Sequence, residues 1–287
     1  MKKLHKNVFC QTTSDGANIG CVIGEDAVVC IDLPLDPAEA RAWRAQIGEI
    51  SDHPIRAVIF TASDRMNDES LAAMNASAAV LHNAAFAHVV AVPVEPMWSS
   101  PFDLPPAPVA GEFGGTPSIS FSDAMSIVLG AKHTVFVDVA FQGGYSPDAC
   151  FVTLRDSGIV FTGDHVAVGQ PPNLSKGNLE RWQAILANLK KSRIVTTVVP
   201  GRGPAGEPAK CAEATLDYIK SATLRVKALV RAGRDRKEVA ALVPDLMALY
   251  APKSARSKSS PAYELLSQEV RAGLEHLYDE LQTQNQT

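Results

Sequence analysis

Histidine and cysteine are the side chains whose spacing would most directly indicate a metal site or a nucleophile, and the sequence has seven histidines and five cysteines. No cysteine belongs to a Cys-x-x-Cys pair, and Cys150 lies in an apolar run where a buried thiol would be inert, so we expect reduced structural thiols. His165 directly follows Asp164. The other histidines lie in unrelated segments: His5, His53, His82, His88, His133 and His276. Spacing alone therefore predicts no metal-binding cluster and no nucleophile beside a base.

The composition is typical of a soluble globular protein. The 287 residues are 46% hydrophobic and 20% charged, with a net charge of −4, which argues against a dedicated nucleic-acid binder. The basic residues 1–6 are not followed by a long apolar run, and no apolar stretch reaches the roughly 18 residues that a membrane span needs. We expect a cytoplasmic protein with no signal peptide and no membrane or nucleic-acid partner.

The elements that must position the chemistry alternate between strands and helices. Asp36, Pro37 and Glu39 form the N-cap, N1 and N3 pattern of a helix start. Residues 68–90 are predicted to be helical on both sides of a short strand, and residues 178–189 form an amphipathic helix. The predicted strands are residues 17–23, 27–31, 55–61, 78–81, 124–129, 134–139, 150–154, 159–162 and 194–199.

Two further segments could shape a binding site. Residues 93–118 contain seven prolines and three glycines, which predicts a long irregular loop. In this loop Trp98, Phe102 and Phe113 could line an apolar ligand pocket, or could simply anchor the loop. After residue 208 leucine stripes predict helices that pack on the core or on a second copy of the chain.

Several short motifs occur in the order found in the metallo-β-lactamase-like hydrolases. Residues 18–32 resemble the opening hairpin of that family, and residues 54–61 resemble the strand before its first metal motif. The later motifs are Gln142-Gly143-Gly144-Tyr145-Ser146-Pro147, Phe161-Thr162-Gly163-Asp164 and Val199-Pro200-Gly201-Arg202-Gly203-Pro204. The resemblance covers roughly residues 7–210.

The resemblance implies an α/β fold, a four-layer αββα sandwich, over residues 1–207, followed by a C-terminal helical extension over residues 208–287. It also implies a dinuclear metal centre, commonly zinc, whose hydroxide attacks an ester, amide, thioester or phosphodiester bond. The metal motifs, however, depart from the family pattern. The first is Thr-His-x-His-x-Asp-His in the family, and the four ligand positions here hold Ala62, Asp64, Met66 and Asn67.

The later motifs depart in the same way. Tyr145 and Arg202 occupy positions that hold histidine in the family, and only Asp164 is unchanged. A catalytic zinc needs about three protein ligands, so Asp64, Asp164 and His165 cannot hold two metals. We therefore expect no metal and no cofactor. Arg202 is predicted to supply the missing positive charge, pairing with Asp164 and with Asp64, while Tyr145 fills the volume of the lost imidazole.

Three functions follow from this pattern. The first is a pseudoenzyme, a non-catalytic relative that binds a small molecule or acts as a scaffold, with the C-terminal helices available to form a homodimer. The second is a repurposed hydrolase that cleaves an ester, thioester or related bond without metal. Its candidate catalytic residues are Asp64, Tyr145, Asp164, His165 and Arg202. The third is a mononuclear hydrolase whose atypical metal is held by Asp64, Asp164 and His165.

Overall fold

A computed structural model of the chain describes residues 1–74, 79–83 and 118–284. The described residues form two compact units, which are treated separately below. The first unit comprises the described residues of Met1–Gln142 together with Asp148–Phe161. The second comprises the short turn Gly143–Pro147 and the chain from Thr162 onward.

A seven-stranded mixed sheet forms the larger part of the first unit, with its strands side by side in chain order. The first four strands are antiparallel neighbours, whereas β4 to β7 pair in parallel. The strands are β1 (Lys2–His5), β2 (Val8–Thr12), β3 (Asn18–Ile23), β4 (Val28–Ile31), β5 (Ile55–Ile59), β6 (Ala79–Asn83) and β7 (Ser118–Phe121).

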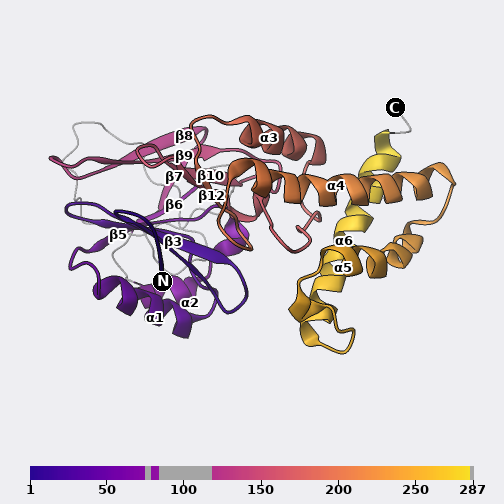
Figure 1. Cartoon of the computed structure of the whole chain (residues 1–287), viewed down its shortest axis with the longest axis horizontal. Coiled ribbons are helices and arrows are strands. Elements are labelled where there is room, and N and C mark those ends of the chain that lie inside the picture. Colours follow the sequence, from indigo (N-terminus) through magenta and orange to yellow (C-terminus); the bar gives the residue numbers. More distant parts are fainter. Residues whose placement is uncertain (75–78, 84–117, 285–287) are drawn as a thin grey trace. The chain divides into compact units, whose positions relative to one another are not determined.

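Helices α1 (Pro37–Gly48) and α2 (Asp68–Met74) lie along one face of this sheet (Figure 1). The Asp36 side chain accepts a hydrogen bond from the Ala38 amide at 2.8 Å, which satisfies a free N–H of the first turn of α1. Helix α1 buries Trp43 and Ile47 in a core cluster that includes Cys30 from β4. The helix face and the sheet face thus share one apolar core.

A second, antiparallel sheet in the first unit contains β8 (Ala124–Leu129), β9 (Val135–Phe141), β10 (Cys150–Leu154) and β11 (Ile159–Phe161). The two sheets meet at Gly20 on β3, because a Cβ atom there would collide with the ring of Phe161 on β11. Val139 on β9 and Val152 on β10 are fully buried. Apolar side chains therefore fill the space between the sheets, as in other sandwich cores.

The second unit is mainly helical. Its elements are α3 (Leu179–Lys191), β12 (Thr197–Val199), α4 (Pro208–Arg231), α5 (Val243–Tyr250) and α6 (Pro261–Gln284). Helix α3 packs on α4, and α6 packs on both α4 and α5 (Figure 1). Gly273 lets α6 approach Leu174 closely, so the C-terminal helix lies against the loop that follows Asp164. Every helix in the described parts of the chain is too short or too polar to span a membrane.

Most of the predicted elements are confirmed. The strand at 150–154 and the helix start at Pro37 have the predicted positions. The hairpin of β1 and β2 was not predicted. The residues predicted to line an apolar ligand pocket, Trp98, Phe102 and Phe113, lie outside the described residues, as does most of the predicted loop 93–118. The division into a domain of residues 1–207 and an extension of residues 208–287 stays a prediction.

Candidate functional site

In the first unit, Asp32 and Thr61 follow the ends of the neighbouring parallel strands β4 and β5. Asp32 is buried and has a φ of 53°, in the left-handed region that non-glycine residues rarely occupy. Its carboxylate accepts hydrogen bonds from the Thr61 amide at 2.9 Å and from the Thr61 hydroxyl at 2.7 Å. These two bonds join the strand ends and offset the unfavourable backbone conformation.

The first motif continues into a short 3-10 helix, η1 (Ser63–Arg65), which contains Asp64. The carboxylate of Asp148 accepts a hydrogen bond from the Ser63 amide at 2.6 Å. A carboxylate that is 85 positions further along the chain therefore fixes the start of this turn. The sequence analysis did not identify Asp148, because nothing in its spacing relates it to Ser63.

The other altered ligand positions of this motif have structural roles. Ala62 is buried, and Met66 packs against the core beneath α1 and α2. The side-chain oxygen of Asn67 accepts a hydrogen bond from the Ser70 amide at 2.9 Å in the first turn of α2. None of these three side chains is thus placed as a metal ligand in the part of the chain that the structure describes.

Cys150 adjoins this network at the start of β10. Its amide donates to the Thr61 carbonyl at 2.8 Å, and its thiol donates to the Phe60 carbonyl at 3.4 Å. Burial raises the pKa of the thiol far above its ordinary value, and the negative charges of Asp32 and Asp148 raise it further. The thiol is therefore protonated at neutral pH, which agrees with the inert role predicted for it.

In the second unit, Asp164 lies in the 3-10 turn η2 (Gly163–His165). Gly201 approaches this turn so closely that a Cβ atom would collide with the Asp164 carboxylate, and its amide donates to the Gly163 carbonyl at 2.7 Å. The next residue, Arg202, places its Nε atom 3.8 Å from Oδ1 of Asp164. The predicted ion pair between Arg202 and Asp164 is thus confirmed, in a geometry longer than a hydrogen bond.

A second carboxylate interacts electrostatically with this pair. Glu269 lies on α6, and partial desolvation raises the pKa of its carboxyl. The positive charge of Arg202 lowers that pKa, while the negative charge of Asp164 raises it. The positive charge of Arg202 therefore acts on two carboxylates, that of Asp164 and that of Glu269 on α6. No sequence motif links α6 to Asp164, which is why Glu269 was not predicted.

His165 is buried, and each of its ring nitrogens faces a backbone carbonyl oxygen, to one of which the N–H of a neutral imidazole donates. Nδ1 lies 3.0 Å from the Thr162 carbonyl oxygen, and Nε2 lies 2.5 Å from the Gly143 carbonyl oxygen. The His165 carbonyl in turn accepts a hydrogen bond from Trp182 Nε1 at 2.9 Å. Because a metal ligand needs a free ring nitrogen, this arrangement suits a structural histidine that ties the second motif to the third.

Tyr145 is buried in the same part of the second unit. Its ring packs edge-to-face on Trp182 at a centroid distance of 5.5 Å, and its centroid is 6.1 Å from that of His165. The preceding residue, Gly144, has a φ of 84° and approaches Ile185 and Trp182 too closely for a side chain. Tyr145 thus belongs to an aromatic cluster at a position where the family pattern has a metal-binding imidazole.

The side chains present do not fit the dinuclear metal centre that the sequence resemblance implies. In the described ranges, no group of three or more histidine, cysteine, aspartate or glutamate side chains is placed to hold a metal ion. Asp164 interacts with a guanidinium, and both nitrogens of His165 face carbonyl oxygens. Tyr145, Asp164, His165 and Arg202 belong to the second unit and Asp64 to the first, so the predicted convergence of Asp64 with the others stays a prediction.

Comparison with known proteins gives a fold and no closer relationship. No protein-family model matches the sequence, and no curated protein matches it. A metallo-beta-lactamase from Pontibacter korlensis has a similar structure, with a TM-score of 0.55, 17% identity, and coverage of 76% of this chain and 97% of that one. The DIM-1 metallo-beta-lactamase exposed to ceftazidime gives a TM-score of 0.56 at 16% identity, covering 77% of this chain and 96% of that one. The chain therefore has the metallo-β-lactamase fold, an α/β sandwich with a C-terminal helical part.

Proposed function

We propose that this chain is a non-catalytic relative of the hydrolases that share its fold, and that it binds a small molecule or acts as a scaffold. The observation that carries this proposal is the contact between Arg202 and Asp164. Arginine stays charged at every physiological pH, so its guanidinium is a permanent cation beside the carboxylate that bridges the metals in the family pattern. A divalent ion at Asp164 would have to displace or repel that cation.

Two further features support the loss of metal chemistry. His165 is fully buried, and a backbone carbonyl would have to move away from one of its ring nitrogens before a metal could bind there. Tyr145 adds aromatic packing where the family pattern has a ligand. His165 and Tyr145 thus make packing and backbone contacts that stabilise the local fold. A histidine that coordinates a metal would not make these contacts.

The direct test is the metal content of the purified full-length protein, measured by inductively coupled plasma mass spectrometry after incubation with zinc, iron and manganese salts and removal of free ion. We expect well under one equivalent of each metal. Asp164→Asn should leave this value unchanged, because Asp164 is not a ligand. One or more equivalents of metal in the wild type, lost in Asp164→Asn, would overturn the proposal.

The alternative, a repurposed hydrolase acting without metal, is favoured by one observation. The raised pKa of Glu269 beside Asp164 and Arg202 is the kind of perturbation that general acids show. The test is turnover of nitrophenyl ester and thioester substrates by the wild type, by Asp164→Asn, and by the exposed control Asp217→Asn on α4. Turnover that disappears only in Asp164→Asn would favour this alternative over a binding or scaffolding role.

A further inference from the structure

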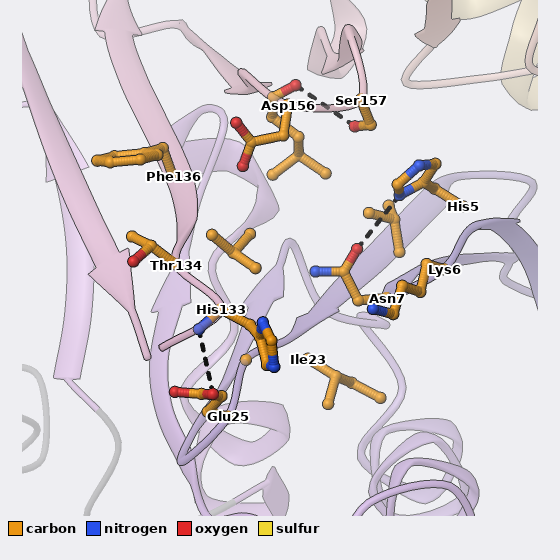
Figure 2. Close-up of a pocket in the computed structure, with 14 residues that line it drawn as sticks. His5, Lys6, Asn7, Ile23, Glu25, His133, Thr134, Phe136, Asp156 and Ser157 are labelled. Atoms are coloured by element: carbon orange, nitrogen blue, oxygen red, sulfur yellow. Dashed lines mark hydrogen bonds between the residues drawn. The ribbon is translucent and has the colours of Figure 1, made fainter. Parts of the chain in front are cut away.

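A cavity of about 470 Å³ lies in the first unit, and none of the candidate site residues of that unit lines it (Figure 2). Its walls come from four turns: those between β1 and β2, between β3 and β4, before β9, and between β10 and β11. The volume falls within the range of roughly 300–1,000 Å³ that is usual for small-molecule sites. All lining residues belong to the same compact unit.

The direction of the strands places this cavity at the opposite end of the sheets from Asp32 and Thr61. Strand β3 ends at the cavity and β4 begins there, and β4 then runs to Asp32. Likewise β10 begins at Cys150, next to Thr61, and ends at the cavity. The cavity is therefore separate from the altered metal motif of this unit.

One wall is held in place by Glu25, in the turn between β3 and β4. Its carboxylate accepts hydrogen bonds from the backbone amides of Ala131, Lys132 and His133 at 3.0, 2.9 and 3.1 Å. These three bonds lower the pKa of Glu25 below its ordinary value, so the group is a carboxylate at neutral pH. His133, which also lines the cavity, interacts electrostatically with this carboxylate, so Glu25 joins both the backbone and a charged side chain of the wall.

The floor and the rim of the cavity differ in polarity. Val8 and Leu154 are buried at the floor, and Ile23 also lines the cavity. At the exposed rim, Figure 2 shows Lys6 and His133 on the side of Ile23 and Glu25, whereas Asp156 lies on the other side beside Ser157. His5 also lines the cavity and contacts Asn7 at 3.3 Å. An apolar floor therefore lies beneath a rim that carries Lys6, His133 and the Glu25 carboxylate on one side and Asp156 on the other.

We propose that this cavity binds a small organic carboxylate whose apolar body contacts the floor and whose anionic group faces Lys6 and His133. Lysine donates up to three hydrogen bonds and carries a full positive charge, and an imidazole N–H is a second donor for a carboxylate. Asp156, at the opposite rim, disfavours the reversed orientation by repelling the anion. The inference concerns a different site from the proposed function, so either could be wrong without the other.

The probe is naphthalene-2-carboxylate, with the neutral naphthalene-2-carboxamide as its matched control, each titrated into the full chain and followed by calorimetry. We expect the carboxylate to bind about tenfold more tightly than the amide, because a hydrogen bond to a charged group is stronger than one to a neutral group. Equal Kd values for the two probes, or no binding of the carboxylate, would overturn the proposal. Inorganic phosphate that binds as tightly as the carboxylate would also overturn it, because the floor would then contribute nothing.

Variants locate the binding. The double change Lys6→Gln and His133→Gln should abolish the preference for the carboxylate, while the backbone amide of residue 133 still donates to Glu25. Asp156→Asn should tighten carboxylate binding, and Lys210→Gln, at an exposed position on α4, should change nothing. Loss of binding in Arg202→Ala, with binding intact in the double variant, would assign the probe to the other site and would overturn this inference.

Discussion

The two motif regions of this protein hold their carboxylates in different ways. In the first unit, Asp32 and Asp148 accept hydrogen bonds from neutral donors, namely the amide and hydroxyl of Thr61 and the amide of Ser63. In the second unit, Asp164 is balanced by the guanidinium of Arg202. One region thus holds its carboxylates with neutral donors, whereas the other holds its carboxylate beside a permanent cation. This difference predicts that stability depends mainly on the first region and that the second region is more tolerant.

The strongest test of the comparison is Asp32→Ala. The change leaves the Thr61 amide and hydroxyl without their buried acceptor, so we expect the free energy of unfolding to fall by about 3 kcal/mol. Urea denaturation followed by circular dichroism measures this. Asp32→Asn, which keeps an acceptor oxygen, is the matched control and should lose less. A wild-type midpoint for Asp32→Ala would mean that these bonds do not stabilise the strand ends.

The next test compares the thiols of the two units. Burial raises the pKa of both Cys150 and Cys211, and nearby carboxylates raise it further: Asp32 and Asp148 at Cys150, and Glu207 at Cys211. At Cys211 the Gly206 amide lowers the pKa and offsets part of the effect of burial. With Ellman's reagent at pH 8, we expect Cys211→Ser to remove a faster phase and Cys150→Ser to remove one at least about tenfold slower. The reverse order would contradict the electrostatic description of the first region.

A smaller effect is expected at the ion pair itself. Arg202 and Asp164 keep 27% and 16% of their side-chain surface exposed, and their closest atoms are 3.8 Å apart. Asp164→Asn should therefore lower the free energy of unfolding by less than about 1 kcal/mol. Thermal unfolding in low and high salt provides the measurement, and the difference from wild type should shrink as salt rises. If Asp164→Asn lowered the free energy of unfolding as much as Asp32→Ala, the two regions would contribute equally to stability.

The smallest effect, and the opposite sign, is expected at Glu269. Because the pKa of this carboxyl is raised in the folded state, the folded protein binds its proton more tightly than the unfolded chain does. Stability should thus decrease as the pH rises from the unfolded pKa through the folded one, and Glu269→Gln should remove that decrease. At pH 7 we expect the melting temperature of Glu269→Gln to be about 1 °C above wild type. A melting temperature below wild type would show that Glu269 stabilises Arg202 more than desolvation costs.

The sequence predicted the framework well because its signals are local. Asp36, Pro37 and Glu39 determine where α1 begins without reference to the rest of the chain. The apolar run that starts at Cys150 similarly identifies β10. The first hairpin was missed because Lys2, Lys3 and Lys6 interrupt any apolar pattern, and β1 is an exposed edge strand. The charged, exposed side chains of β1 do not predict a strand, because β1 is held mainly by backbone hydrogen bonds to β2.

The candidate site could be predicted only where both partners of a contact belong to motifs of the family. Asp164 and Arg202 lie in motifs that the family resemblance places together, and the ion pair is present. Glu269 and Asp148 reach their partners through tertiary folding, since 105 positions separate Glu269 from Asp164 and 85 separate Asp148 from Ser63. No spacing rule covers such separations. The sequence also gave no sign that both nitrogens of His165 face backbone carbonyls.

The three backbone hydrogen bonds that the Glu25 carboxylate accepts have a consequence for how the protein is synthesised. Its three amide donors lie 106 to 108 residues further along the chain, so they do not yet exist when the first four strands leave the ribosome. Closing a loop of this length is entropically costly and slow compared with forming local hairpins. The strands β1 to β4 can pair early, but the turn that carries Glu25 gains its partners only after residue 133 is made, so this end of the sandwich is completed late in synthesis. A ribosome that stalls before residue 131 would leave Glu25 without its amide donors and the seven-stranded sheet without strands β9 to β11 of the second sheet.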